Sequence, residues 1–152
     1  MKTVLIVLAV GLAAALLLAL YVRHAPTDAA RWHVDPKTAE RPGKGGWLVR
    51  PEGGDATAGV WDLPPAEVLA RFDALVRAHP RTEVLAGSVA EGRITYVSRS
   101  DFWQFPDYTT VEAVAVPGGS SLAVLGRLRF GQSDLGVNRA RIQGWIDRIP
   151  DT

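Results

Sequence analysis

A single uncharged run near the N-terminus constrains this chain more than any other feature. From Val4 to Val22 the sequence reads VLIVLAVGLAAALLLALYV, nineteen residues without a charge. As a helix such a run rises roughly 28 Å, close to the ~30 Å hydrocarbon core of a bilayer. We therefore expect residues 1–23 to form a transmembrane signal-anchor, and residues 4–22 to be the contact with the membrane.

The flanks of the run favour an anchor that stays attached. Tyr21 and Arg23 suit the lipid–water boundary, and no clear Ala-x-Ala cleavage site follows. A cleaved signal peptide is the main alternative, and a buried soluble helix is a third. A short tail before one span most often leaves the large C-terminal part outside the cytoplasm. We therefore expect a single-pass protein of the bacterial inner membrane with a periplasmic C-terminal domain.

Composition excludes several functions. The 152 residues contain no cysteine, which rules out disulfides, thiolate metal sites, a cysteine nucleophile and a lipid-attachment cysteine. Lys2 and Arg23 flank the apolar run, and the rest of the chain then holds 15 basic and 16 acidic residues. This balance gives no basic footprint, so we expect no nucleic-acid partner.

Residues 24–61 form a connector rich in proline, glycine and tryptophan. Because Trp32, Trp47 and Trp61 each carry a large ring, we expect the connector to pack on the domain rather than to hang free. Trp47–Arg50 could add a short edge strand. Two interpretations remain open for this segment, a strap over the domain and a tryptophan-lined ligand groove.

Residues 62–152 carry the pattern of one α+β domain. An amphipathic helix is predicted from a cap at Asp62 to about Ala78, and a second helix from about Leu135 to Ile149. Between them lie two predicted hairpins, 82–90 with 93–99 and 109–116 with 121–130. The order helix, hairpin, hairpin, helix predicts a two-layer sandwich with an antiparallel sheet of four to five strands.

Two stretches resemble a known family. They are YVSRSDFWQFPDYTTVE, residues 96–112, and RLRFGQSDLGVNRARIQ, residues 127–143. Their aromatic-Pro-Asp step and their Gly-x-Ser-Asp-x-Gly-x-Asn-Arg box resemble the bacterial domain-of-unknown-function family numbered 1499. The resemblance covers roughly Leu63 to Ile149. It implies export or membrane attachment, as in many members, and it implies no activity.

Phe105-Pro106-Asp107 is the first candidate constellation. Proline fixes the local backbone, so the simplest interpretation is a turn that joins the hairpins. Asp107 could instead face the arginines at Arg127, Arg129, Arg139 and Arg141. Arginine forks bind carboxylate or phosphate at two points, which would make a pocket for an acidic ligand. The alternative is a solvated face with an internal pair from Arg129 to Asp107 or Asp134.

The second constellation is Ser133, Asp134 and Asn138. Ser133 or Asp134 suits a helix N-cap. Asn138 falls within the apolar stripe of the predicted helix, together with Leu135, and a buried amide needs hydrogen-bond partners. It is expected to tie the helix to residues 105–108 or to a strand end, with a ligand contact as the alternative.

We expect a non-catalytic binding module whose partner is an envelope protein, an anionic small molecule or a lipid head group. Histidines are scattered, and no metal-ligand spacing, serine-nucleophile elbow or phosphate loop is present, so no cofactor is expected. The alternatives are a hydrolase that uses Asp107, Asp134 and the arginines, and a purely structural envelope component. The candidate binding residues are Asp107, Arg127, Arg129, Ser133, Asp134, Asn138 and Arg139.

Overall fold

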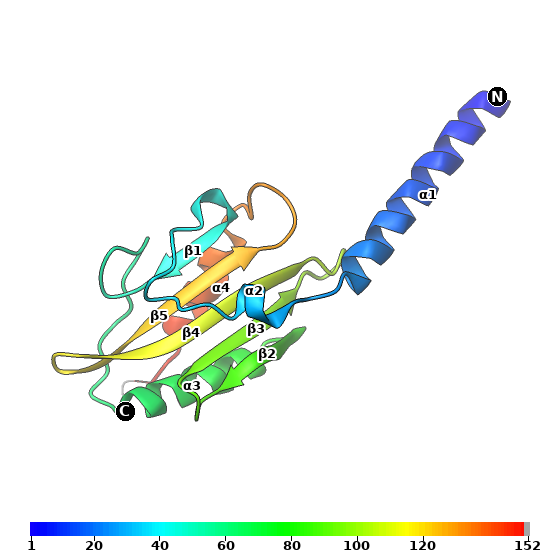
Figure 1. Ribbon diagram of the computed structural model, residues 1–152. Coiled ribbons are helices and arrows are strands. Elements are labelled where there is room, and N and C mark those ends of the chain that lie inside the picture. The colour runs from blue at the N-terminus through cyan, green and yellow to red at the C-terminus, as the bar shows by residue number, and fades with distance from the viewer. Residues whose placement is uncertain (151–152) are drawn as a thin grey trace.

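The computed structural model describes residues 1–150 and shows a long N-terminal helix projecting from an α+β domain (Figure 1). This helix, α1 (Lys2–His24), is long and apolar enough to cross a membrane, and its apolar side chains are exposed. At its C-terminal end it touches the domain. Val22 is buried there, and the Tyr21 ring meets the edge of Phe130 at a centroid distance of 6.0 Å. The helix therefore leaves the domain at a defined point on its surface.

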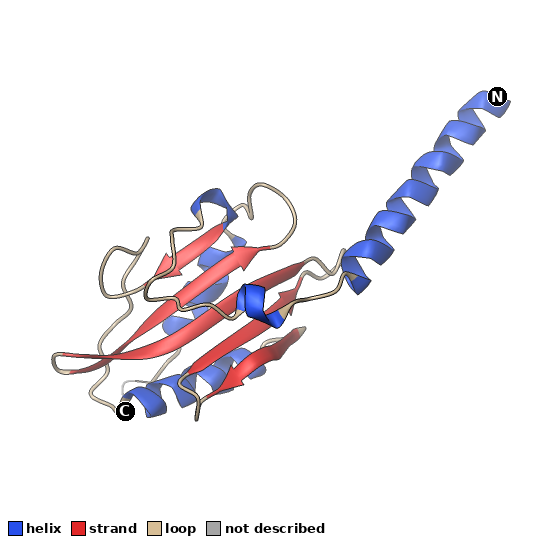
Figure 2. Ribbon diagram, viewed as in Figure 1, coloured by secondary structure: helices blue, strands red, loops and turns tan. Residues whose placement is uncertain are grey.

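A five-stranded antiparallel sheet forms the centre of the domain (Figure 2). Its spatial order is β1-β5-β4-β3-β2. The strands are β1 (Gly46–Val49), β2 (Thr82–Ser88), β3 (Arg93–Arg99), β4 (Pro106–Val116) and β5 (Gly119–Leu128). Both hairpins are present as expected, and the predicted edge strand pairs with β5, with Leu48 opposite Leu125. The predicted α+β fold is confirmed.

Two helices, α3 (Pro65–Arg77) and α4 (Val137–Ile146), cover one face of the sheet. Alternate strand residues such as Ile94, Val111 and Val124 point toward these helices, as the two-residue period of a strand requires. Between the layers Phe72 meets the edge of Trp145 at 6.0 Å. This apolar layer is the main core of the domain.

The first part of the connector, before β1, covers the opposite face of the sheet. It contains the short helix α2 (Ala29–Trp32) and a 3₁₀ turn, η1 (Gly43–Gly45). Trp32 is buried against Tyr108 of β4, with ring centroids 3.9 Å apart and planes 15° apart. Thr110 of β4 donates to the Trp32 carbonyl at 2.9 Å, and His33 bonds to Thr95 at 2.9 Å. The connector is thus a strap held by polar contacts to the sheet.

The start of α3 departs from the prediction. Asp62 does not cap this helix; Pro64 is the N-cap residue and makes no side-chain bond. The reason is local, because an N-cap carboxylate at Asp62 would need backbone N–H groups two and three residues later. Those residues are Pro64 and Pro65, which have none.

Two further boundaries also differ. Pro106 and Asp107 are not a turn but the first residues of β4, opposite Arg99 and Ser98. Proline is tolerated as the first residue of a strand, and the turn lies just before it. Leu135 is 91% exposed and lies outside α4, because its backbone is left-handed with φ of 53°. The predicted apolar stripe therefore begins only at Asn138.

Candidate functional site

Arg127 of strand β5, and Arg129 just beyond the end of that strand, face the strap rather than the helices. Arg127 donates through Nη2 to the Trp32 carbonyl at 2.6 Å, and its guanidinium lies 4.9 Å from the centre of the Trp32 ring. A cation over an indole face is attracted by the ring quadrupole. Arg127, Trp32 and Tyr108 therefore form a stack that joins the sheet to the strap.

Arg129 holds the chain where it leaves α1. Its guanidinium donates to the Pro26 carbonyl at 2.7 Å, to the Ala25 carbonyl at 3.4 Å and to Thr27 Oγ1 at 3.1 Å. It also donates to the Tyr108 hydroxyl at 3.1 Å. All its partners are neutral, so its positive charge stays uncompensated. The predicted internal pair from Arg129 to Asp107 or Asp134 is wrong.

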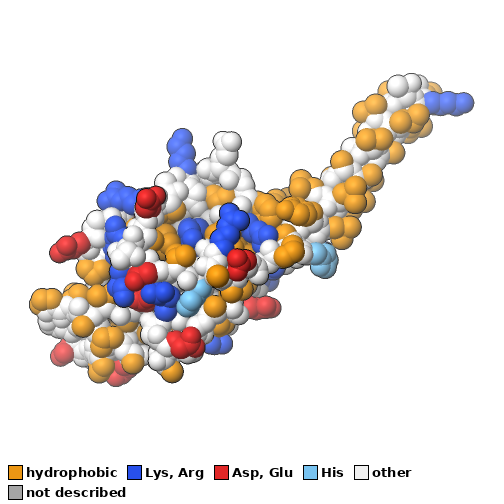
Figure 3. All heavy atoms as spheres, in the orientation of Figure 1, with side chains coloured by type: hydrophobic (Ala, Val, Ile, Leu, Met, Phe, Trp, Pro, Cys, Tyr) orange, Lys and Arg blue, Asp and Glu red, His pale blue; other side chains and the backbone are white. Residues whose placement is uncertain are grey.

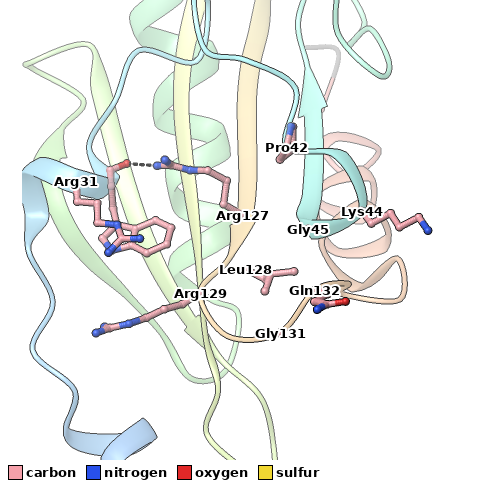
Figure 4. Close-up of a pocket in the computed structure, with 10 residues that line it drawn as sticks. Arg31, Pro42, Lys44, Gly45, Arg127, Leu128, Arg129, Gly131 and Gln132 are labelled. Atoms are coloured by element: carbon pink, nitrogen blue, oxygen red, sulfur yellow. Dashed lines mark hydrogen bonds between the residues drawn. The ribbon is translucent and has the colours of Figure 1, made fainter.

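A cavity of about 450 Å³ opens beside these two arginines, between the strap, η1 and the end of β5 (Figure 4). Arg31 and Lys44 bring two more positive charges from the connector, and Arg31 lies 5.4 Å from the Trp32 ring. Figure 4 shows Arg31, Arg127 and Arg129 on one side of the cavity and Lys44 on the other, with its side chain directed away from the arginines. The remaining lining residues are uncharged: Trp32, Pro42, Gly45, Leu128, Gly131 and Gln132.

The charges around this cavity are unbalanced. None of its four cations pairs with a carboxylate within residues 1–150. Burial, and then the nearby charge of Arg31, lower the pKa of Arg127. Its buried Nε also has no hydrogen-bond partner among those residues. A bound anion would supply the missing negative charge.

Asp107 and Asn138 belong to a different cluster, between β4 and α4. Asp107 Oδ2 accepts from Arg141 Nη2 at 3.1 Å and from Asn138 Nδ2 at 3.4 Å. Arg141 also donates to Asn138 Oδ1 at 2.6 Å. Asn138 is fully buried, and its amide connects the helix to the strand as the sequence led us to expect. Burial raises the pKa of Asp107, although Arg141 and Asn138 oppose the change.

Ser133 and Asp134 build the start of α4. Asp134 accepts from the backbone N–H groups of Gly136 at 3.0 Å and Asn138 at 2.9 Å, while Ser133 Oγ accepts from Leu135 N at 3.2 Å. Burial alone would raise the pKa of Asp134, but these backbone bonds outweigh it and hold the pKa below its ordinary value. The capping role is thus present, two residues ahead of the formal N-cap, Gly136.

The structure divides the predicted binding residues into separate places. Arg127 and Arg129 share the cationic cavity, whereas Asp107, Ser133 and Asp134 line a different one of about 410 Å³. Asn138 is sealed in the cluster between β4 and α4. Arg139 lies 4.9 Å over the Trp47 ring, beside a third cavity of about 420 Å³.

Sequence reasoning missed two residues of the cationic cavity, Arg31 and Lys44. Both lie in the connector, where no periodic pattern shows which way a side chain points. The sequence offered one usable signal, because Arg31 adjoins Trp32, a residue large enough to demand burial. It gave no signal for Lys44, which reaches the cavity only through the position of η1.

Fold and cavity together define a class of protein, a small α+β domain on one membrane-length helix with a cation-lined cavity under a strap. The chain belongs to the DUF1499 family, described as a protein of unknown function, whose family model matches residues 52–149. The family expected from the sequence is confirmed, with a match that begins earlier than Leu63. No curated protein and no solved structure matches the chain. Arg127 and Arg129 lie inside the matched range, whereas Arg31 and Lys44 precede it.

Proposed function

We propose that this protein is a membrane-anchored binding module that holds an anionic ligand in the cavity formed by Arg31, Lys44, Arg127 and Arg129. One observation carries the proposal: four cations surround one cavity, and no carboxylate within residues 1–150 pairs with any of them. Like charges held together without a counter-ion repel one another, and a bound anion removes that cost. The ligand class is a phosphate- or carboxylate-bearing molecule.

The position of the cavity favours a ligand at the membrane surface. Arg129 donates to the carbonyls of Ala25 and Pro26, the residues that directly follow α1. With α1 in a bilayer, the cavity opens near the head groups. An anionic lipid head group and a small anion near the membrane share the chemistry that these arginines recognise.

Binding can be tested on the full chain in an uncharged detergent, with short-chain phosphatidylglycerol and inorganic pyrophosphate as probes. The pair Arg31→Gln and Lys44→Gln removes two exposed charges that make no hydrogen bond within the described residues. It is expected to weaken binding roughly tenfold at unchanged thermal stability, since each exposed charge contributes up to about 1 kcal/mol. Arg148→Gln, which changes an exposed arginine just after the end of α4, is the matched control.

The two probes separate the sources of the anion. Preference for phosphatidylglycerol supports a lipid head group, and preference for pyrophosphate supports a soluble anion. If the double variant binds each probe as tightly as the unsubstituted protein does, the cavity is not the binding site and the proposal is refuted. Loss of binding in Arg148→Gln as well would show non-specific charge attraction instead.

We further propose that the domain lies on the periplasmic side of the bacterial inner membrane. The length and hydropathy of α1 support one span across a membrane. A reporter that is active only outside the cytoplasm, fused after Thr152, should be active. Activity of only a cytoplasmic reporter at the same position would reverse the orientation.

Hydrolysis of an envelope substrate is the second candidate function. Asp107 and Asp134 line one cavity, and their pKa values move in opposite directions, upward for Asp107 and downward for Asp134. Two carboxyls in contrasting environments can serve as acid and base. Asp107→Asn keeps the shape of the side chain and should abolish turnover of an envelope ester or glycan while pyrophosphate binding persists. Retained turnover would remove this candidate.

A further inference from the structure

We propose that the domain makes a second contact with the bilayer through an apolar rim, formed by Phe102, Trp103, Leu135 and Val137. Phe102 and Trp103 lie in the β3–β4 loop, Leu135 lies just before α4, and Val137 is the first residue of α4. The inference rests on the part of the proposed function that places α1 across a membrane. It is independent of the anionic ligand.

Exposure sets the rim apart from the rest of the domain. Phe102 is 78% exposed, Trp103 49% and Leu135 91%. After α1, the large apolar side chains that are exposed within residues 25–150 are Val60, Phe102, Trp103, Leu135 and Val137. Four of these five belong to the rim. Scattered exposed apolar residues are ordinary, but a group on one end of a domain marks an interaction surface.

The rim lies at the end of the domain that α1 joins. In Figure 1 the β3–β4 loop lies beside the C-terminal end of α1, and the loop after β5 projects toward the same side. A row of rings makes the connection: Tyr21 of α1 meets Phe130 at 6.0 Å, and Phe130 meets Phe105 at 6.2 Å. Figure 3 shows the apolar side chains of α1 continuing onto this end of the domain. A bilayer around α1 would therefore reach the rim.

The backbone holds the aromatic side chains of the loop outward. Ser100 N donates to the Phe105 carbonyl at 3.0 Å, and Phe105 N donates to Ser100 Oγ at 3.0 Å. Gln104, with a left-handed φ of 60°, closes the turn through side-chain bonds to the carbonyls of Ser100 and Asp101, both at 3.1 Å. A loop fixed in this way loses little conformational entropy when it binds.

The chemistry of the rim matches a lipid–water interface. Tryptophan is enriched at that depth because its ring is apolar while its N–H can still meet water or head groups. The acidic residue of the loop, Asp101, pairs with Arg81, so its charge is compensated. Arg23 and His24, at the end of α1, lie where phosphate groups would be. A bilayer is the partner that the anchor itself brings to this surface.

Because the chain contains no cysteine, single cysteines can report depth without background. The full chain is reconstituted in vesicles of phosphatidylcholine and phosphatidylglycerol that carry nitroxide lipids. An environment-sensitive fluorophore is attached to Leu12→Cys in α1, to Phe102→Cys in the rim, or to Val60→Cys. Val60 is the matched control, since it is 56% exposed and adjoins Trp61, which pairs with Ser120 at the β4–β5 hairpin.

We expect nitroxides near the head groups to quench the fluorophore at position 102 roughly twofold more than the one at position 60. Mid-bilayer nitroxides should quench position 12. If position 12 is quenched while position 102 behaves like position 60, the anchor stands and the rim contact is refuted. An unquenched position 12 would refute the anchor itself.

A second measurement covers the possibility that a label disturbs the loop. With the fluorophore at Leu135→Cys, the added pair Phe102→Ser and Trp103→Ser should shift its emission toward that of water, since both segments approach the bilayer together. An unchanged emission would refute the joint contact. Shielding of position 102 from water without quenching by any nitroxide lipid would assign the rim to a protein partner and also refute the proposal.

Discussion

The contact between Asp107 and Arg141 should make the stability of the domain depend on pH in a specific way. The two side chains are only 17% and 11% exposed, and they are joined by an Nη2–Oδ2 distance of 3.1 Å. Arg141→Met removes the cation and keeps most of the apolar stem. Breaking a buried pair typically costs 3–5 kcal/mol because the remaining charge is left without compensation. Because some exposure remains, we expect a loss of about 2–4 kcal/mol near pH 8.

The loss should shrink at low pH. Burial already raises the pKa of Asp107, and removing Arg141 removes the attraction that opposes this shift. A carboxyl whose pKa is raised by folding stabilises the folded state below its unfolded pKa and loses that contribution as pH rises through its folded pKa. The variant can therefore protonate Asp107 more readily as the pH falls and recover part of the loss.

Denaturant titrations of the full chain in detergent would measure the loss of unfolding free energy at about pH 5 and at about pH 8. Arg148→Met applies the same chemical change to an exposed arginine just after α4 and should cost little at either pH. The double variant Arg141→Met and Asp107→Leu removes both charges and should be more stable than Arg141→Met alone. A loss for Arg141→Met that is equal at the two pH values, or below about 0.5 kcal/mol, would refute the reasoning.

Other predictions concern packing, the strap and a histidine. Gly126→Ala should lower the free energy of unfolding by about 1–3 kcal/mol, because the added Cβ would lie 2.6 Å from Ile142 Cδ1. Gly144→Ala, on α4 where a Cβ meets open space, should raise it by about 0.5–1 kcal/mol. Denaturant titrations measure both changes. Trp32→Ala should cost about 3 kcal/mol and expose the connector to limited proteolysis; a connector that stays protected would contradict its role as a strap. Burial, and then the charges of nearby arginines, lower the pKa of His79 in the folded protein. The unfolded chain therefore binds the proton more readily, and stability should fall as the pH drops below about 6.5. His79→Gln should flatten this pH dependence in thermal melts.

The sequence predicted the elements whose signal is local. The uncharged run of α1 and the alternation in β4 and β5 depend only on neighbours along the chain, and the structure contains each of them. The errors occurred where backbone chemistry overrides a pattern. Two prolines deprived Asp62 of amides to accept, and the left-handed backbone at Leu135 moved that residue out of the helix.

The candidate site was predictable only in part, for a physical reason. The alternation of strand residues shows that Arg127 and Arg129 share a face, but it does not show what covers that face. The path of the connector brings Arg31 beside Arg127. The packing of α4 on the sheet makes Arg141, and not Arg129, the ion-pair partner of Asp107.

The sequence by itself determined that this protein has a membrane-length helix, an antiparallel α+β domain and a polar start to its last helix, because these follow from hydrophobic period and local hydrogen bonding. The tertiary structure alone decided which charges are compensated. Whether a charge finds a partner depends on distances between segments far apart in the chain, and these distances leave four cations around one cavity and an apolar rim beside α1.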